Sequence, residues 1–167
     1  MEKNLRQILI MDSKEFKKLF SEIALLNDFN KAYSGWYKKT NECIAILELQ
    51  KSNFGNYYLL NIKIFIDGIF NRNYLPSKEL IKSPMGHITN QISEISVLDF
   101  EKPIEDYIRK DKLENLFLQT INPFTDKVLS ISGIKELVNK GDIFLLSAII
   151  DELEKQKTKI YPDGSDM

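Results

Sequence analysis

The chain has 167 residues, of which 43% are hydrophobic and 28% charged, and its formal net charge is -1. This balance is typical of one globular domain with a sizeable core. Because Lys and Arg are scattered among Asp and Glu, the charge gives no electrostatic reason to expect a nucleic-acid or anionic-membrane partner. Asn61, Lys63 and Asp67 interrupt the longest apolar run, which falls short of the roughly 20 residues that span a bilayer.

The cysteine content and the N-terminus bear on location. Cys43 is the only cysteine, so it cannot form an intramolecular disulfide, and the N-terminus lacks the pattern of a secretory signal. The sequence therefore predicts a cytoplasmic protein. We expect one domain over 1–167, which consists of an N-terminal extension (1–11), a helix with a sheet (12–98), C-terminal helices (99–155) and a mobile tail (156–167).

The first predicted elements are a helix, a turn and a short strand. The helix begins at Asp12 or Ser13 and ends near Asp28, and Glu15 is placed for a capping box. Its apolar positions predict a face that covers a sheet: Phe16, Leu19, Phe20 and Ile23. Residues 30–35 are typical of a turn, and residues 36–39 of a strand.

Two β-prone runs, residues 43–50 and 57–66, predict a hairpin around the polar segment 52–56. Only one face of each run is free of charged and amide side chains, so pairing these faces places Leu49 opposite Leu60 and Leu47 opposite Ile62. A slip by one residue would bury Glu48 and Lys63. This register centres the turn between Phe54 and Gly55, and we expect Gly55 and the neighbouring asparagines to supply positive φ angles.

The opposite face of the hairpin carries both polar and apolar side chains. Ile46 and Leu59 lie among polar residues there, which predicts partial cover by a helix, a loop or a partner. Glu48 and Lys63 are expected to form an exposed diagonal pair worth under about 1 kcal/mol.

The rest of the chain predicts one more strand and then helices. Residues 68–84 contain several helix and strand breakers and predict an irregular excursion, and residues 86–95 predict a strand with Ile88 and Ile92 inward. Helices are expected from Pro103 to a stop at Asn122-Pro123, over 131–140 and over 142–155. An apolar stripe is expected on the last helix: Ile143, Leu146, Ile150 and Leu153. The fold class is α+β, with an N-terminal helix packed on an antiparallel sheet of about four strands, followed by a helical C-terminal segment.

The candidate ligand or partner surface lies at the end of the hairpin. Gln50 and Asn61 share a face, with Ser52 and Tyr57 close by, so amide and hydroxyl groups could converge on a polar ligand or a peptide backbone. The alternative, which we favour, is that these groups cap the turn and bond locally. Ile46 and Leu59 extend this surface as a candidate partner contact.

The residues with catalytic potential stand alone. His87 is the only histidine, and a general base or metal ligand requires companions, so a hydrogen-bonding strand histidine is favoured. Cys43 reads as a small buried hydrophobe. Paired-carboxylate chemistry has little support, because the acidic candidates lie on separate predicted elements: Glu48, Asp67, Asp99 and Glu101.

The run LELQKSNFGNYYLLNIKIFI, with Gln50-Lys51-Ser52 before the turn and Tyr58 and Asn61 after it, resembles a bacterial family classified as domain of unknown function number 4304. The similarity covers about residues 12–95. It implies the helix, the aromatic entry strand, the hairpin and the strand near His87, and it implies no activity.

Two classes of function remain, with no cofactor, metal or catalytic residue assigned. The favoured class is a non-catalytic protein-interaction or regulatory module, and a toxin-neutralising role is an analogy with other small domains. The alternative is a small-ligand binder or an unrecognised enzyme that uses Gln50, Ser52, Asn61 and His87. A deep pocket lined by these residues would favour the second class, and a flat apolar face the first.

Overall fold

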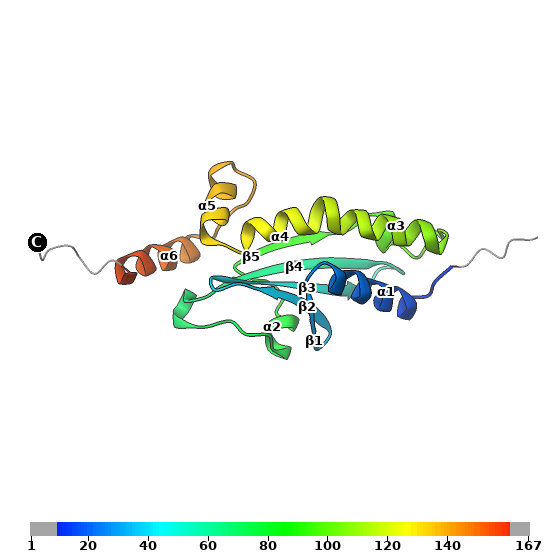
Figure 1. Ribbon diagram of the computed structural model, residues 1–167, viewed down its shortest axis with the longest axis horizontal. Coiled ribbons are helices and arrows are strands. Elements are labelled where there is room, and N and C mark those ends of the chain that lie inside the picture. Colours follow the sequence, from blue (N-terminus) through cyan, green and yellow to red (C-terminus); the bar gives the residue numbers. More distant parts are fainter. Residues whose placement is uncertain (1–9, 161–167) are drawn as a thin grey trace, which may run out of the picture.

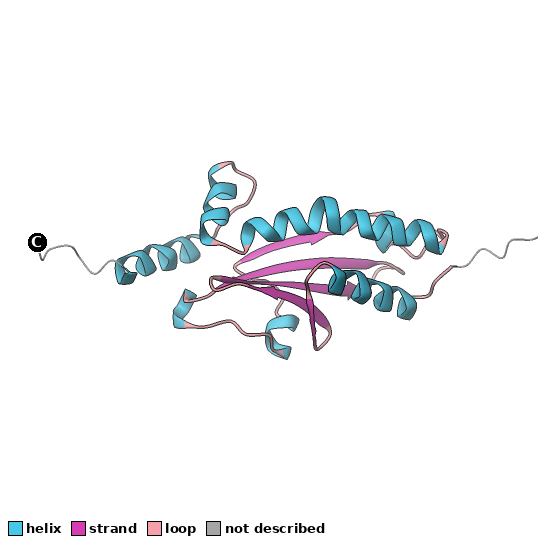
Figure 2. Cartoon of the chain, in the orientation of Figure 1, coloured by secondary structure: helices cyan, strands magenta, loops and turns pink. Residues whose placement is uncertain are grey.

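The computed structural model describes residues 10–160 of the chain. It confirms the α+β class, with a sheet of five antiparallel strands instead of about four, in the order β1-β2-β3-β4-β5. Figure 1 shows helices on both sides of this sheet, and Figure 2 gives the same view by secondary structure. The strands are β1 (Asn30–Ala32), β2 (Gly35–Lys39), β3 (Cys43–Lys51), β4 (Tyr58–Ile66) and β5 (Ile88–Ile92). The helices are α1 (Ser13–Leu26), α2 (Lys78–Lys82), α3 (Asp106–Leu116), α4 (Asn122–Val128), α5 (Ile131–Asn139) and α6 (Ser147–Ile160), with short helical segments η1 (Ile69–Asn71), η2 (Ser96–Leu98) and η3 (Phe117–Ile121).

The additional strand is β1, which corrects the prediction of a turn over residues 30–35. Asn30 pairs with Tyr37 and Ala32 pairs with Gly35, so the turn itself is only Tyr33 and Ser34. Tyr33 takes the left-handed φ of 54° that the tight turn requires. A strand this short is held by backbone pairing and has no alternating pattern to read from the sequence.

The predicted hairpin register is confirmed, because Leu49 faces Leu60 and Leu47 faces Ile62. The prediction of positive φ at Gly55 and the asparagines is wrong, since these residues are absent from the positive-φ positions. The Ser52 backbone N–H donates to the Tyr57 carbonyl, which leaves a four-residue loop, and the Phe54 N–H donates to Ser52 Oγ. A loop of that length turns without left-handed residues.

The charge-free face of the sheet forms the main core. It is covered by α1 and by the helix that runs from α3 through η3 to α4 (Figure 1). Phe20 of α1 joins the layers, because its ring lies 4.6 Å from that of Trp36 on β2 and 5.2 Å from that of Phe117. Ile88 of β5 is buried on this face.

The expected helix stop at Asn122-Pro123 is wrong, because the helix continues to Val128. Pro123 lies two residues after the end of η3, a segment of π-helical backbone. Proline has no N–H to donate to the carbonyl four residues earlier. The wider π turn has already rearranged the bonding pattern at that point, so the helix passes the proline without ending.

The mixed face of the sheet is covered from within the chain. Residues 68–84, expected to be irregular, contain η1 and α2, and α2 lies on the side of the sheet opposite α4 (Figure 1). Ile46 is fully buried. Lys63 is 1% exposed, donates to Glu48 at 2.5 Å, and also bonds the carbonyls of Ile81 and Ser83. The expected exposed pair is therefore an ion pair between a buried Lys63 and a half-buried Glu48, because a segment distant in sequence folds over it.

The C-terminal helices differ in part from the prediction. α5 is present as expected, but α6 begins at Ser147 instead of 142 and continues to Ile160, into the expected tail. The predicted stripe is wrong at Leu146 and Ile150, which are exposed, whereas Leu145, Ile149 and Leu153 are buried. Residues 1–9 of the N-terminal extension and 161–167 of the tail lie outside the described residues. Over residues 10–160, no helix has the length and apolar character needed to cross a membrane.

Candidate functional site

A row of three amide side chains crosses the mixed face of the sheet. Asn61 Nδ2 on β4 donates to Gln50 Oε1 on β3 at 2.9 Å, and Gln91 Nε2 on β5 donates to Asn61 Oδ1 at 2.8 Å. Gln50 and Gln91 are exposed and Asn61 is half-buried. Gln91 was missed from the sequence because only the pairing of β4 with β5 places it opposite Asn61.

Ser52 and Tyr57 lie at the hairpin end but act differently. Ser52 Oγ accepts the Phe54 N–H at 3.0 Å, which is the local turn role favoured from the sequence. Tyr57 lines a cleft at the hairpin end. Leu59 is half-buried opposite Gln50, and Ile46 lies beneath the internal cover.

His87 does not join this group. Its Nδ1 accepts the Ile66 N–H at 2.9 Å, at the opposite end of β4. Seven residues separate Ile66 from Leu59, which is about 23 Å along a strand. Burial and the nearby Arg72 lower the pKa of His87 to about 4. The imidazole is neutral, lies against the rings of Phe65 and Tyr74, and serves as an acceptor for the strand backbone.

The thiol of Cys43 is fully buried on the core face. Burial, followed by the charges of Glu42 and Asp67, raises the pKa of this thiol to about 12. A thiol that stays protonated is a poor nucleophile. Cys43 therefore acts in packing, as its position in the sequence suggested.

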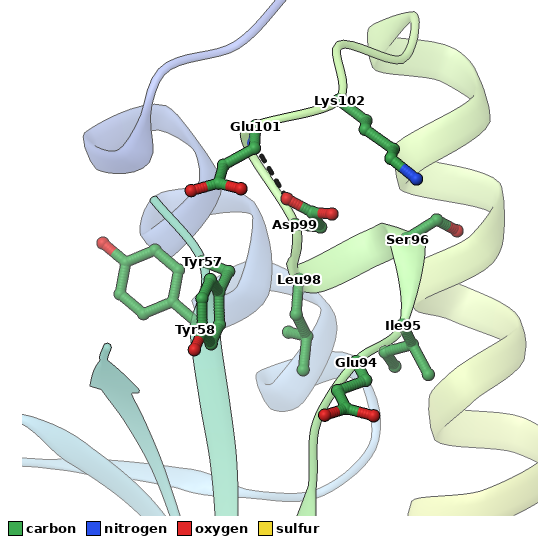
Figure 3. Close-up of a pocket in the computed structure, with 9 residues that line it drawn as sticks. All are labelled: Tyr57, Tyr58, Glu94, Ile95, Ser96, Leu98, Asp99, Glu101 and Lys102. Carbon is green, nitrogen blue, oxygen red and sulfur yellow. Dashed lines mark hydrogen bonds between the residues drawn. The ribbon is translucent and has the colours of Figure 1, made fainter. Parts of the chain in front are cut away.

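A cleft of about 390 Å³ opens between the start of β4 and the loop that follows β5, and of the surface residues predicted from the sequence it is lined by Tyr57 but not by Gln50, Ser52, Asn61 or His87. Tyr57 lines it from β4, and Glu94, Asp99, Glu101 and Lys102 line it from the loop. In Figure 3 the Glu101 carboxylate lies on the same side as Tyr57, at the hairpin end. The remaining lining residues are Tyr58, Ile95, Ser96 and Leu98. Asp99 and Glu101 were considered from the sequence only as separate carboxylates, and the fold brings them onto one cleft.

Backbone contacts hold the cleft wall against the hairpin. Asp99 forms a β-bridge with Tyr57, and the Phe100 N–H donates to the Asn56 carbonyl at 2.9 Å. Glu101 Oε1 accepts the Asn56 N–H at 3.1 Å, and Asp99 Oδ1 accepts the Glu101 N–H at 2.8 Å (Figure 3). The loop that carries the carboxylates is therefore fixed to the turn of the hairpin.

Arg109 of α3 supports this loop from behind. Its guanidinium is fully buried and donates to the carbonyls of Val97 at 2.7 Å, Ser96 at 3.2 Å and Asp99 at 3.1 Å. It also lies 4.1 Å from the centre of the Phe100 ring. Burial lowers the pKa of Arg109 from its ordinary value. The sequence showed only a cation on a predicted helix, and nothing in it indicated a buried position.

The cleft carries more negative than positive charge, with Lys102 in its lining and Arg109, which interacts electrostatically with Asp99, behind it. Within the described residues, Glu94, Asp99 and Glu101 form no ion pair. No three His, Cys, Asp or Glu side chains in residues 10–160 gather where they could hold a metal ion. The carboxylates thus face solvent from a fixed loop, with Lys102 as the one cation in the lining. Such an arrangement favours cationic partners.

Comparisons with known proteins give one match. A family model described as Domain of unknown function (DUF4304) matches residues 26–127, which confirms the resemblance drawn from the hairpin. The matched range contains the whole sheet, the loop that lines the cleft and α3, and it ends before α5 and α6. No curated protein and no solved structure matches the chain.

Proposed function

We propose, from the premise that this chain belongs to the DUF4304 family, that it is a non-catalytic protein-interaction module that binds a positively charged segment of a partner protein. The observation that carries the proposal is the cleft beside the hairpin, where three carboxylates without ion pairs stand on a loop fixed by Arg109. Charges held in place before binding lose little freedom on association, which favours recognition over random surface attraction.

The uncharged groups around the cleft suit the same partner. Tyr57 offers an aromatic surface, and aromatic faces attract Lys and Arg side chains. The amide row from Gln50 to Gln91 continues the surface and offers donors and acceptors to a polypeptide backbone. His87 and Cys43 support a non-catalytic role, because both are engaged in packing or backbone bonding.

The test measures binding of a flexible cationic peptide, acetyl-Gly-Lys-Gly-Lys-Gly-Lys-Gly-amide, by NMR titration and calorimetry. The variant Glu94→Gln/Asp99→Asn/Glu101→Gln removes three charges and keeps the acceptor oxygens of Asp99 and Glu101. We expect about tenfold weaker binding, since each lost charge contact contributes modestly. The interaction should also weaken as salt rises from about 50 to about 300 mM.

The matched control removes three carboxylate charges from the exposed surface of the long helix. Asp111→Asn/Glu114→Gln/Asp126→Asn changes the net charge by the same amount and leaves the cleft intact. This control should bind the peptide almost as the unaltered chain does. Equal loss in both triple variants would reduce the interaction to net charge and refute a specific site.

A further inference from the structure

We infer that the partner segment binds in an extended conformation and adds a sixth, antiparallel strand along the open edge of β5, with its basic N-terminal residues in the cleft. This inference rests on the proposed function and specifies how the partner is held. Strand addition to a sheet edge obtains its affinity from main-chain hydrogen bonds and its specificity from neighbouring side chains.

The hydrogen-bonding pattern shows which groups β5 directs outward. The bond from Ser52 N–H to the Tyr57 carbonyl makes that pair a hydrogen-bonded one. Because such pairs alternate along antiparallel strands, odd-numbered residues of β4 bond to β3 and even-numbered residues bond toward β5. Two hydrogen bonds of even-numbered residues agree with this alternation. The Asn56 carbonyl accepts from the Phe100 N–H, and the Ile66 N–H donates to His87, both on the β5 side.

This alternation identifies two residues of β5 whose backbone groups point away from β4. Ile88, Asn90 and Ile92 face even-numbered residues of β4 and bond to it. Thr89 and Gln91 therefore direct their N–H and C=O groups away from the sheet, and no backbone partner for these groups occurs in residues 10–160. Both residues are exposed. Two such residues spaced by one form the repeat that an incoming strand needs.

This edge lacks the protection that sheets normally carry. Exposed edges are usually blocked by Lys, Pro, a bulge, or very short length. β5 reads Ile-Thr-Asn-Gln-Ile, pairs with β4 in an unbroken register, and contains neither charge nor proline. The other edge, β1, is only three residues long and carries Lys31. Because β1 carries edge protection and β5 does not, we infer that another strand pairs with the edge of β5.

Charge complementarity selects the occupant and its direction. Glu94 follows β5 by two residues, so a strand on this edge reaches the acidic cleft at the C-terminal end of β5. An antiparallel strand enters the cleft with its N-terminal residues, which must then be basic. A second copy of β5 brings no positive charge, because Ile88–Ile92 contains no Lys or Arg. Charge complementarity therefore favours a basic segment of a different protein over a second copy of β5 as the occupant.

The experiment uses the full chain and the probe acetyl-Lys-Lys-Thr-Val-Thr-Val-Thr-amide. Two further versions carry N-methyl groups on all Thr amides or on all Val amides, which block main-chain donors without changing charge or side chains. Because the donors of a paired strand alternate in direction, we expect one version to bind about tenfold more weakly and the other to bind about as the parent does. Equal binding of both versions would overturn strand addition.

Hydrogen exchange followed by NMR gives a second readout. Saturating peptide should slow exchange of the Thr89 and Gln91 amides about tenfold or more, whereas the Asn90 amide, already bonded to β4, should change little. The isomer with its lysines at the C-terminus should bind more weakly. Unchanged exchange at both Thr89 and Gln91 would exclude the edge as the contact.

The two proposals fail in different ways. Suppose that Glu94→Gln/Asp99→Asn/Glu101→Gln weakens binding of the Gly-Lys peptide while both methylated versions bind equally. That result would support the acidic cleft as the binding site and refute strand addition at β5. If that triple variant and its helix control bind alike, the proposed function itself falls. A dimer in light scattering that dissociates on Gln91→Pro would show that β5 pairs with its own copy and would overturn the assignment of a basic partner.

Discussion

Lys63 and Arg109 show how single buried cations organise this protein. Each donates hydrogen bonds to backbone carbonyls of a segment outside the sheet. Lys63 donates to the carbonyls of Ile81 and Ser83. Arg109 donates to carbonyls between Ser96 and Asp99. Burying a charge is costly unless hydrogen bonds compensate it. The carbonyls do so for Lys63 and for both terminal nitrogens of Arg109, whereas the buried Arg109 Nε has no hydrogen-bond partner among the described residues. These two side chains therefore fix the cover of the mixed face and the wall of the cleft, respectively.

His87 makes stability depend on pH. Its pKa is lowered to about 4 from an ordinary 6.5 by burial and Arg72, and its Nδ1 must stay unprotonated to accept the Ile66 N–H. Below about pH 6.5 the unfolded chain binds a proton that the folded chain does not. The contribution of His87 to stability is therefore full above that pH and is lost as the pH falls toward 4.

The measurement compares urea unfolding of the unaltered chain with that of His87→Asn at about pH 7 and about pH 4.5. Asparagine offers an acceptor oxygen and does not titrate in this range. We expect the stability advantage of the unaltered chain over the variant to shrink at the lower pH. A constant difference would contradict a neutral, buried His87.

At the scale of elements, the contact between α5 and α4 depends on Gly133. Glycine within a helix normally costs about 1 kcal/mol relative to alanine. Here a Cβ on Gly133 would lie 1.9 Å from the Lys127 carbonyl oxygen, a backbone atom that cannot move aside alone. Gly133→Ala should therefore destabilise the protein by about 2 kcal/mol or more, although propensity alone predicts the opposite.

Urea unfolding checks the sign of this effect. Lys135→Ala provides the control, because Lys135 is exposed on the same helix and its replacement should change the free energy of unfolding by less than about 0.5 kcal/mol. A Gly133→Ala protein as stable as the unaltered chain would mean that α5 does not sit this close to α4.

The register of the hairpin can be predicted from the sequence, whereas the start of α6 cannot. The hairpin register follows from the sequence because a slip by one residue would move Glu48, Asn61 and Lys63 onto the face that packs against α1 and the long helix, where apolar side chains offer them no partners. The start of α6 does not follow from the sequence, because the apolar residues from Ile143 to Ile150 are compatible with two different buried faces of a helix. The contacts of Leu145 and Ile149 with the core decide between them.

At the scale of the whole molecule, α6 lies outside the family match and contacts the segment that follows β4. Glu152 accepts the Phe70 N–H, and Gln156 Nε2 donates to the Asp67 carbonyl. Deleting residues 142–167 should lower the free energy of unfolding by about 2 to 5 kcal/mol, because the hydrophobic contribution of buried Leu145, Ile149 and Leu153 is lost while the conformational entropy spent on ordering the helix is regained. The shortened chain should still unfold cooperatively, because other elements cover both sheet faces.

Circular dichroism with urea unfolding measures this loss, and hydrogen exchange at Phe70 should quicken in the shortened chain. Lys155→Ala in the full chain should leave stability almost unchanged, since its side chain is 69% exposed. A deletion without cost, or one that abolishes cooperative unfolding, would contradict the view of α6 as a brace on a self-sufficient sheet.

The sequence by itself determined the fold class, the hairpin register and the shared face of Gln50 and Asn61, because alternation along a strand is a local property that burial makes costly to violate. Only the tertiary structure decided the rest. It placed α2 over Ile46 and Lys63, separated His87 from the hairpin end, and brought Asp99 and Glu101 beside Tyr57. These contacts join segments far apart in the chain, and their geometry depends on how helices pack on the sheet, which no local pattern encodes.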